Sequence, residues 1–68
     1  MIVLHFNNRP DVIAGVQDWL RCYHIGATWR EIRERNILVG HRVEIPDCPP
    51  EAVDSLMSAS DISVMEVK

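Results

Sequence analysis

Apolar and polar residues alternate along three stretches of the chain, as they do in strands with one buried face. Residues 2–6 are rich in β-forming residues and are followed by two asparagines, which favour a turn. Residues 37–45 continue the alternation until a proline-rich stretch forbids it. Residues 62–67 repeat the pattern near the end of the chain. We therefore predict three strands.

Two other stretches carry apolar residues at helical spacing. Residues 10–23 predict an amphipathic helix, with Pro10 in its first turn and an asparagine before it that can cap the free amides. Gly15 inside this helix suggests a close approach of another backbone. A second helix is predicted that takes Pro49, Pro50 and Glu51 in its first turn and ends at residues 58–61. The apolar stripes are Val12, Ile13, Val16, Trp19, Leu20 and Tyr23 in the first helix, and Ala52, Val53, Leu56 and Met57 in the second.

Residues 24–36 fit both a strand and a helix. Their first half alternates apolar and polar residues, which favours a strand. Thr28 and Glu31 instead have the spacing of a capping box, and the residues after them are strong helix formers. The order of the other elements favours a strand that runs into a hairpin turn near Arg35 and Asn36. A helix over residues 28–36 is the alternative.

The predicted order of elements is β-α-β-β-α-β, which is typical of the ferredoxin-like fold. In this α+β fold, two right-handed βαβ units place both helices on one face of a four-stranded antiparallel sheet. The length of 68 residues fits a single domain over residues 1–68. The other face of the sheet has no cover within one chain, so we expect it to meet a partner. That face would present Val3, Leu38, Met65 or Val67, His5, Thr28, Arg42 and Glu44.

Composition and charge narrow the classes of function. With 47% hydrophobic and 25% charged residues, the chain has the composition of a globular protein. Its net charge of −3 argues against a protein whose main partner is nucleic acid or an anionic membrane surface. We expect a cytoplasmic protein, because no apolar run could cross a bilayer and the first residues lack the features of a secretory signal. Cys22 and Cys48 are then expected to be reduced thiols.

The candidate chemistry indicates a binding protein rather than an enzyme. The serines after residue 50 lie where solvent-facing positions are predicted, so we do not expect them to act as nucleophiles. The glycines are isolated and form no phosphate-binding loop. The cysteines and histidines match no ligand spacing of a metal site. We therefore expect no catalytic residue, no metal and no cofactor.

The one locally basic region lies between residues 30 and 44. Glutamates are interleaved with its arginines, and four arginines against three glutamates leave a net charge of +1. Phosphate-binding sites usually concentrate unopposed positive charge, so this region does not predict one. An aromatic residue beside arginines is instead typical of protein interfaces. We therefore predict a partner interface at Trp29, Arg30, Arg33 and Arg42.

The chain also resembles an ACT domain. Residues 8–16 read Asn-Arg-Pro-Asp-Val-Ile-Ala-Gly-Val, and they are followed by Leu20 and then by His-Ile-Gly at residues 24–26. Residues 51–56 and 61–64 are similar to the second helix and the last strand of the family. The resemblance covers nearly the whole chain and implies the same ferredoxin-like fold.

The resemblance further implies a regulatory domain that binds a small amino-acid-like ligand, usually across the interface of a homodimer. Carried over to this chain, the ligand-binding residues would be Asn7, Asn8, Arg9, Asp11, Val12 and Gly26. The chain departs from the family at Asp11, where ACT domains have a glycine that lets the ligand approach the helix amides. The negative charge of Asp11 would repel an amino-acid carboxylate.

These observations together indicate a small non-enzymatic regulatory module, expected to be a homodimer, that acts on a protein partner by direct contact or through a small ligand. The alternative is an inhibitor or adaptor protein of a phage or mobile element, which docks on a host target through Trp29 and the arginines. A third interpretation takes residues 28–36 as a helix and residues 10–36 as the helix-turn-helix of a DNA-binding regulator.

Overall fold

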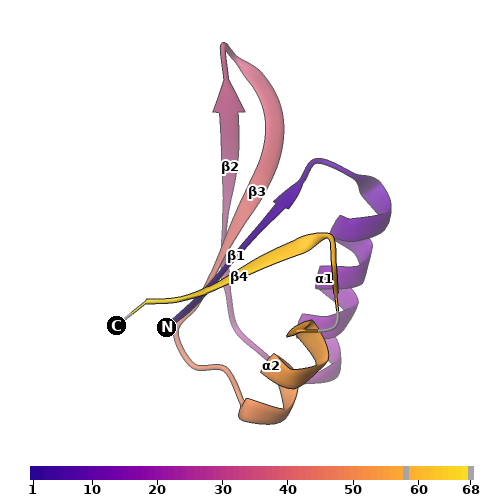
Figure 1. The fold of residues 1–68 in the computed structure, drawn as a ribbon, viewed down its shortest axis with the longest axis vertical. Helices are drawn as coiled ribbons and strands as arrows, with labels where there is room; N and C mark the ends of the chain where they lie inside the picture. The colour runs from indigo at the N-terminus through magenta and orange to yellow at the C-terminus, as the bar shows by residue number, and fades with distance from the viewer. Residues whose placement is uncertain (58, 68) are drawn as a thin grey trace.

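The structure of the protein, a computed structural model, describes residues 1–57 and 59–67, except for the side chain of Met57. Its elements are β1 (Ile2–Asn7), α1 (Pro10–Cys22), β2 (Thr28–Glu34), β3 (Ile37–Ile45), α2 (Pro50–Met57) and β4 (Ile62–Glu66). This order confirms the α+β, ferredoxin-like arrangement predicted from the sequence (Figure 1). The predicted end of the second helix includes residue 58, which lies outside the described residues. Neither of the described helices is long and apolar enough to span a membrane.

The four strands form one antiparallel sheet in the order β2-β3-β1-β4. The central strands are β3 and β1, and each βαβ crossover skips a strand position, as the ferredoxin-like fold requires. The pairing of β1 with β4 also brings the two ends of the chain together, where the Met1 amino group donates to the Val67 carbonyl at 3.0 Å. Figure 1 shows both helices on the same side of the sheet and the β2–β3 hairpin extending beyond them.

The hydrophobic core lies between the sheet and the two helices. The sheet contributes alternate residues of its central strands and the helices contribute their inner stripes: Leu4, Phe6, Val43 and Ile45 from the sheet, and Val12, Val16, Leu20 and Leu56 from the helices. Each such side chain stabilises the fold by about 1.5–3 kcal/mol when fully buried. The helical stripes predicted from the sequence are buried or half-buried at every described side chain. The predicted place of Met57 in the second stripe lies outside the described side chains.

Residues 28–34 form a strand, so the helix predicted as the alternative over residues 28–36 is wrong. All seven residues of β2 pair with β3, from Thr28 opposite Glu44 to Glu34 opposite Ile37. The chain reverses at Arg35 and Asn36, whose φ values of 51° and 64° belong to the left-handed region that tight hairpins require. The helix-turn-helix interpretation loses its second helix.

One irregularity interrupts the β2–β3 pairing. Ile32 lies opposite Gly40, but Arg33 lies opposite Leu38, so Val39 is an extra residue in β3. The bulge therefore belongs to β3, and β2 remains a regular strand. Because the bulge places Leu38 opposite Arg33, on the side of the sheet that carries the helices, the prediction of Leu38 on the helix-free face is wrong.

The C-terminal end of α1 uses a histidine where glycine is usual. The Ile25 amide donates to the Leu20 carbonyl at 2.9 Å and the His24 amide donates to the Arg21 carbonyl at 3.3 Å, which closes the helix in a Schellman motif. This motif needs a left-handed residue, and His24 supplies it with a φ of 53°. A side chain in this conformation is strained relative to glycine.

Two glycines lie in opposite environments. A Cβ on Gly40 would come 2.6 Å from the carbonyl oxygen of Phe6, so the close approach of β1 to β3 requires glycine there. A Cβ on Gly15 would meet no atom within 4 Å. The close backbone approach predicted at Gly15 is therefore wrong, and Gly40 is the residue that permits one.

Candidate functional site

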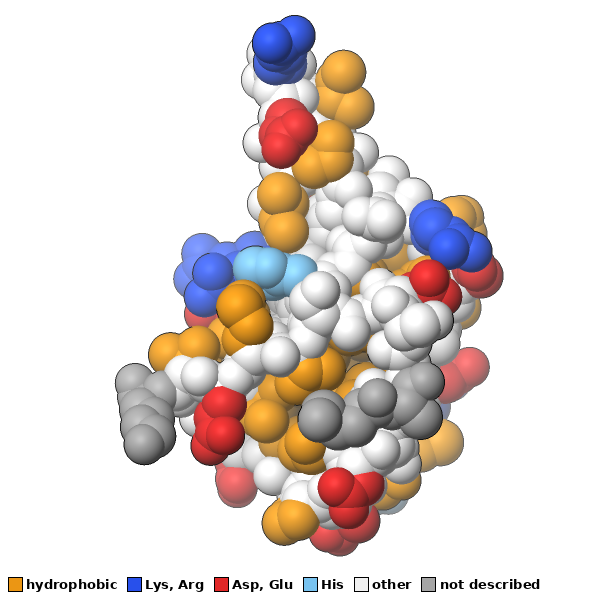
Figure 2. Space-filling view, in the orientation of Figure 1, with side chains coloured by type: hydrophobic (Ala, Val, Ile, Leu, Met, Phe, Trp, Pro, Cys, Tyr) orange, Lys and Arg blue, Asp and Glu red, His pale blue; other side chains and the backbone are white. Residues whose placement is uncertain are grey.

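The helix-free face of the sheet gathers side chains from all four strands. The register places two rows of neighbouring residues on this face, Thr28, Glu44, Val3 and Met65 in one and Arg30, Arg42, His5 and Ser63 in the next. No described helix or strand covers it. Figure 2 shows blue basic, pale blue histidine and orange hydrophobic side chains next to one another on the left side of the molecule, away from the helices of Figure 1.

In these two rows, Arg30 and Arg42 share the carboxylate of Glu44, and the carboxylate of Glu34 lies farther along β2 on the same face. The Nε of Arg30 donates to Oε1 of Glu44, and an Nη of Arg42 lies 3.9 Å from Oε2 of the same residue. The Glu44 side chain is only 20% exposed, whereas that of Arg30 is 66% exposed. The carboxylate of Glu44 is therefore less exposed than the two guanidinium groups that it contacts. The charge that these rows present to solvent is positive.

Apolar side chains border the charged rows. Val3 is fully buried although it lies on the helix-free face, so neighbouring side chains cover it. Met1, Met65 and Val67 alternate onto the same face, and they are exposed by more than a third. His5 lies between Arg42 and Ser63, and its Nε2 is buried without a hydrogen-bond partner among the described residues. The face thus combines arginine, a half-buried polar ring and exposed apolar area.

The predicted partner interface is split between the two faces of the sheet. Arg30 and Arg42 lie opposite each other on the helix-free face. Trp29 and Arg33 alternate onto the other face, where the Trp29 ring meets Phe6 edge-on at a centroid distance of 5.7 Å. Arg33 donates to Glu31 at 3.1 Å on that side. The four predicted residues therefore lie on one hairpin but do not form one surface.

The ligand-binding corner implied by the ACT resemblance lies between β1 and α1. Arg9 is the N-cap residue of α1 and makes no side-chain cap, so the asparagine cap predicted from the sequence is wrong. Oδ1 of Asn8 instead lies 3.2 Å from Nε2 of His41. Arg9 pairs with Asp11 at 2.8 Å and with Asp61 at 3.6 Å. The corner therefore holds two carboxylates against one guanidinium group.

The remaining residues of the predicted ligand site do not join this corner as a group. Asn7 ends β1 and is exposed beside Asn8, but Val12 is buried in the core. Gly26 lies past the opposite end of α1, in a hollow that also contains Tyr23 and Cys48. Since α1 has 13 residues and rises about 1.5 Å per residue, Gly26 lies about 20 Å from the corner along the helix axis. One small ligand could not contact both ends within one chain.

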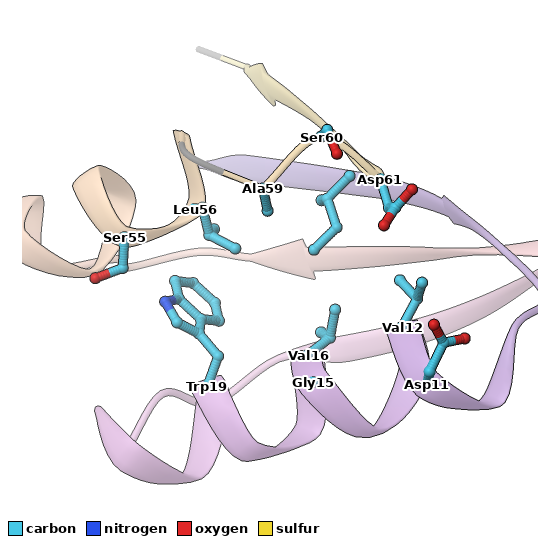
Figure 3. Close-up of a pocket in the computed structure, with 11 residues that line it drawn as sticks. Asp11, Val12, Gly15, Val16, Trp19, Ser55, Leu56, Ala59, Ser60 and Asp61 are labelled. Carbon is cyan, nitrogen blue, oxygen red and sulfur yellow. The ribbon is translucent and has the colours of Figure 1, made fainter.

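A groove between the two helices has no counterpart in the sequence predictions. It has a volume of about 450 Å³, and Figure 3 shows Trp19 from α1 and Leu56 from α2 pointing toward each other across it, with Asp11 and Asp61 at its other end. The Trp19 indole donates to the Ala52 carbonyl at 3.1 Å and joins the helices there. The groove was missed because its walls come from residues more than thirty positions apart in the sequence, which no local pattern connects.

The cysteines and the metal-ligating side chains stay apart in the described part of the chain. Cys22 is exposed, Cys48 is half-buried, and both are free thiols. Burial, and then the nearby charges of Asp47 and Glu51, raise the pKa of the Cys48 thiol. In residues 1–57 and 59–67, no three His, Cys, Asp or Glu side chains gather in a way that could hold a metal ion.

Comparisons of the chain with models of known families, with curated proteins and with solved structures find no match. The resemblance to ACT domains stays a prediction that rests on the residues and on the element order.

Proposed function

We propose that the chain is a non-enzymatic binding module that regulates a protein partner by direct contact through the helix-free face of its sheet. The observation that carries the proposal is the uncovered face itself, where Arg30 and Arg42 stand beside exposed apolar side chains. Arginine and methionine are enriched at protein interfaces, because their long side chains bury apolar stems while arginine also pairs with carboxylates.

The composition of this face favours a partner surface of defined chemistry. Arg30 and Arg42 share the single carboxylate of Glu44, so the part of the face around these two arginines would attract carboxylates of a partner. Met1, Met65 and Val67 require apolar contact next to those carboxylates. The partner is therefore a protein with an apolar patch bordered by Asp or Glu side chains. An inhibitor or adaptor that docks on a target would use the same face.

The alternative of a small amino-acid-like ligand receives less support from the corner between β1 and α1. Arg9 is already paired with Asp11 and Asp61, and this excess of negative charge disfavours a ligand carboxylate. A panel of amino acids in a thermal-shift assay should leave the melting temperature unchanged. A reproducible rise that an Asp11→Asn substitution enlarges would instead favour the ligand interpretation and count against ours.

Charge reversal on the proposed face tests direct contact. Partners captured from cells by the tagged protein should be lost when Arg42→Glu is introduced. They should be kept with Arg21→Glu, which makes the same charge change at an exposed side chain of α1, away from the proposed face. Met65→Asp should have the same effect as Arg42→Glu, because it places a charge in the apolar border. Circular dichroism of each variant checks that the fold is intact. Capture that survives both Arg42→Glu and Met65→Asp would overturn the proposal.

A further inference from the structure

The outer edge of β2 is a second uncovered surface, distinct from the sheet face. In the order β2-β3-β1-β4, β2 has a neighbour on one side only. Its seven residues are exposed except for the half-buried Ile32. Because the bulge lies in β3, β2 itself is a regular strand with a straight row of backbone groups along its outer edge. Such an edge is a template for pairing with another strand.

The hydrogen-bond pattern of the sheet identifies which residues of β2 aim their backbone groups outward. The Asn8 amide donates to the Val39 carbonyl at 3.1 Å, so by alternation the odd-numbered residues of β3 bond to β1. The backbone groups of the even-numbered residues of β3 must then bond to β2. Up to the bulge, these residues lie opposite even-numbered residues of β2: Glu44 opposite Thr28, Arg42 opposite Arg30 and Gly40 opposite Ile32. The outward amides and carbonyls of β2 therefore belong to Trp29, Glu31 and Arg33.

The side chains of β2 carry a charge pattern that is complementary to itself. Residues 30–34 read Arg-Glu-Ile-Arg-Glu, with opposite charges at equal distances on either side of Ile32. If two copies pair antiparallel about Ile32, Glu31 of each lies opposite Arg33 of the other, and Arg30 lies opposite Glu34. If the pairing were centred on residue 31 instead, Glu31 would lie opposite Glu31 of the other copy. If it were centred on residue 33, Arg33 would lie opposite Arg33 of the other copy. Opposite charges across a strand pair stabilise it and like charges destabilise it, so the Ile32 register is favoured.

We propose that a second copy of this chain binds at β2, with a twofold axis at Ile32. The two four-stranded sheets then join into one continuous sheet of eight strands. Since the axis is perpendicular to the sheet, all helices stay on one side and the two helix-free faces lie side by side on the other. The inference does not rest on the proposed function, because it uses the edge of the sheet rather than its face.

The contacts that the β2 side chains make within one chain are compatible with the pairs that the dimer requires. Glu31 and Arg33 already pair at 3.1 Å on the helix-bearing side of β2, so in the dimer four alternating charges would meet there. Arg30 uses its Nε for Glu44, and its two Nη groups are further donors that can reach the partner's Glu34. Ile32 would meet the partner's Ile32 in a close pair without hydrogen bonds, where side chains approach most. The edge thus offers hydrogen bonds, ion pairs and one apolar contact.

Two single charge reversals and their mixture test this interface. Sedimentation equilibrium should show a concentration-dependent dimer for the unaltered chain, measured up to about millimolar concentration because small interfaces bind weakly. Glu31→Arg and Arg33→Glu each turn two attractive pairs into two repulsive ones, so we expect the dissociation constant of each to rise about ten-fold or more. A one-to-one mixture of the two variants places arginine opposite glutamate again, and it should form a heterodimer at least as tightly as the unaltered chain.

The mixture separates an interface effect from a loss of fold, because each variant loses the same internal Glu31–Arg33 pair whether alone or mixed. NMR gives an independent readout of the register. A contact between the α-protons of Arg30 and Glu34 should appear, although within one strand these residues lie about 13 Å apart. A monomer at every concentration, or a dimer that resists both reversals, would overturn the proposal, as would a mixture that stays monomeric.

Discussion

Replacing Gly40 with alanine adds one methyl group where two central strands leave no room for it. Gly40 lies in β3 opposite Asn7 of β1. The new Cβ would come 2.6 Å from the Phe6 carbonyl oxygen, 3.5 Å from its carbonyl carbon and 3.6 Å from the Asn7 Cα. All three atoms belong to the backbone of β1, so none can rotate away as a side chain would. The two strands must separate or slide at this point.

The magnitude follows from the size of the overlap and from where it falls. Ordinary contact of a Cβ begins near 3.4 Å, so the shortest distance is too small by most of an ångström. Forcing extra volume into a packed region costs about 1–3 kcal/mol, and a backbone obstacle favours the upper half of that range. A chain of this length has a total stability of about 3–10 kcal/mol. We therefore expect Gly40→Ala to lose about 2–3 kcal/mol and to lower the melting temperature by about 10–20 °C.

The matched control is the same substitution at Gly15. That position is exposed within α1 and offers open space to a Cβ, so Gly15→Ala should stabilise the protein by about 0.5–1 kcal/mol. Urea unfolding followed by circular dichroism measures both changes. If Gly40→Ala is as stable as the unaltered chain, the close approach of β1 to β3 does not exist and the register described above is wrong.

Three further substitutions or reactions test local features. His24→Gly should raise the free energy of unfolding by about 1 kcal/mol, because glycine adopts the left-handed conformation without strain. The control His24→Ala should not raise it, because alanine is strained there as histidine is. Equal effects of the two substitutions in thermal unfolding would contradict the strain at His24. Cys48 should react with iodoacetamide more slowly than the exposed Cys22, because burial, and then the nearby carboxylates of Asp47 and Glu51, raise the pKa of the Cys48 thiol. Asp47→Asn should speed the reaction of Cys48. Equal rates for the two cysteines in peptide mass spectrometry would contradict the raised pKa of Cys48. Trp19→Phe should cost about 1 kcal/mol, because it removes the indole hydrogen bond to α2, and an unchanged urea midpoint would show that this bond contributes nothing.

Periodicity in the sequence predicts most of this fold, and tertiary pairing explains where it fails. Residues 37–45 form β3 with the predicted bounds, because their alternation and β-forming side chains agree with burial on one face. Residues 28–34 carry helix-forming side chains and a capping-box spacing, which favour the alternative helix. They form β2, as the alternation and the order of elements predicted, because pairing with β3 satisfies their backbone. The bulge at Val39 leaves no local signal, so the side on which Leu38 lies could not be predicted.

The candidate site is harder to predict than the fold, because it depends on pairs that are distant in sequence. The sequence indicates arginines near Trp29 as an interface, but only the register shows that Arg30 and Arg42 are neighbours and that Trp29 lies on the opposite face. Arg9 and Asp61, which form an ion pair, are 52 positions apart in the sequence, and no sequence motif predicts their contact. Charge self-complementarity about Ile32 is present in the sequence, but it acquires meaning only once β2 is known to be an edge strand.

Both proposals require residues 28–34 to be an extended edge strand in register with β3, and proton contacts measured by NMR test this most directly. Trp29 and Val43, and likewise Glu31 and His41, are opposite residues that do not exchange hydrogen bonds, so their α-protons should lie close together. Strong contacts between the α-protons of these two pairs are the predicted result. Strong contacts between successive amide protons through residues 28–34 would instead indicate a helix, and they would contradict the face, the edge and the fold together.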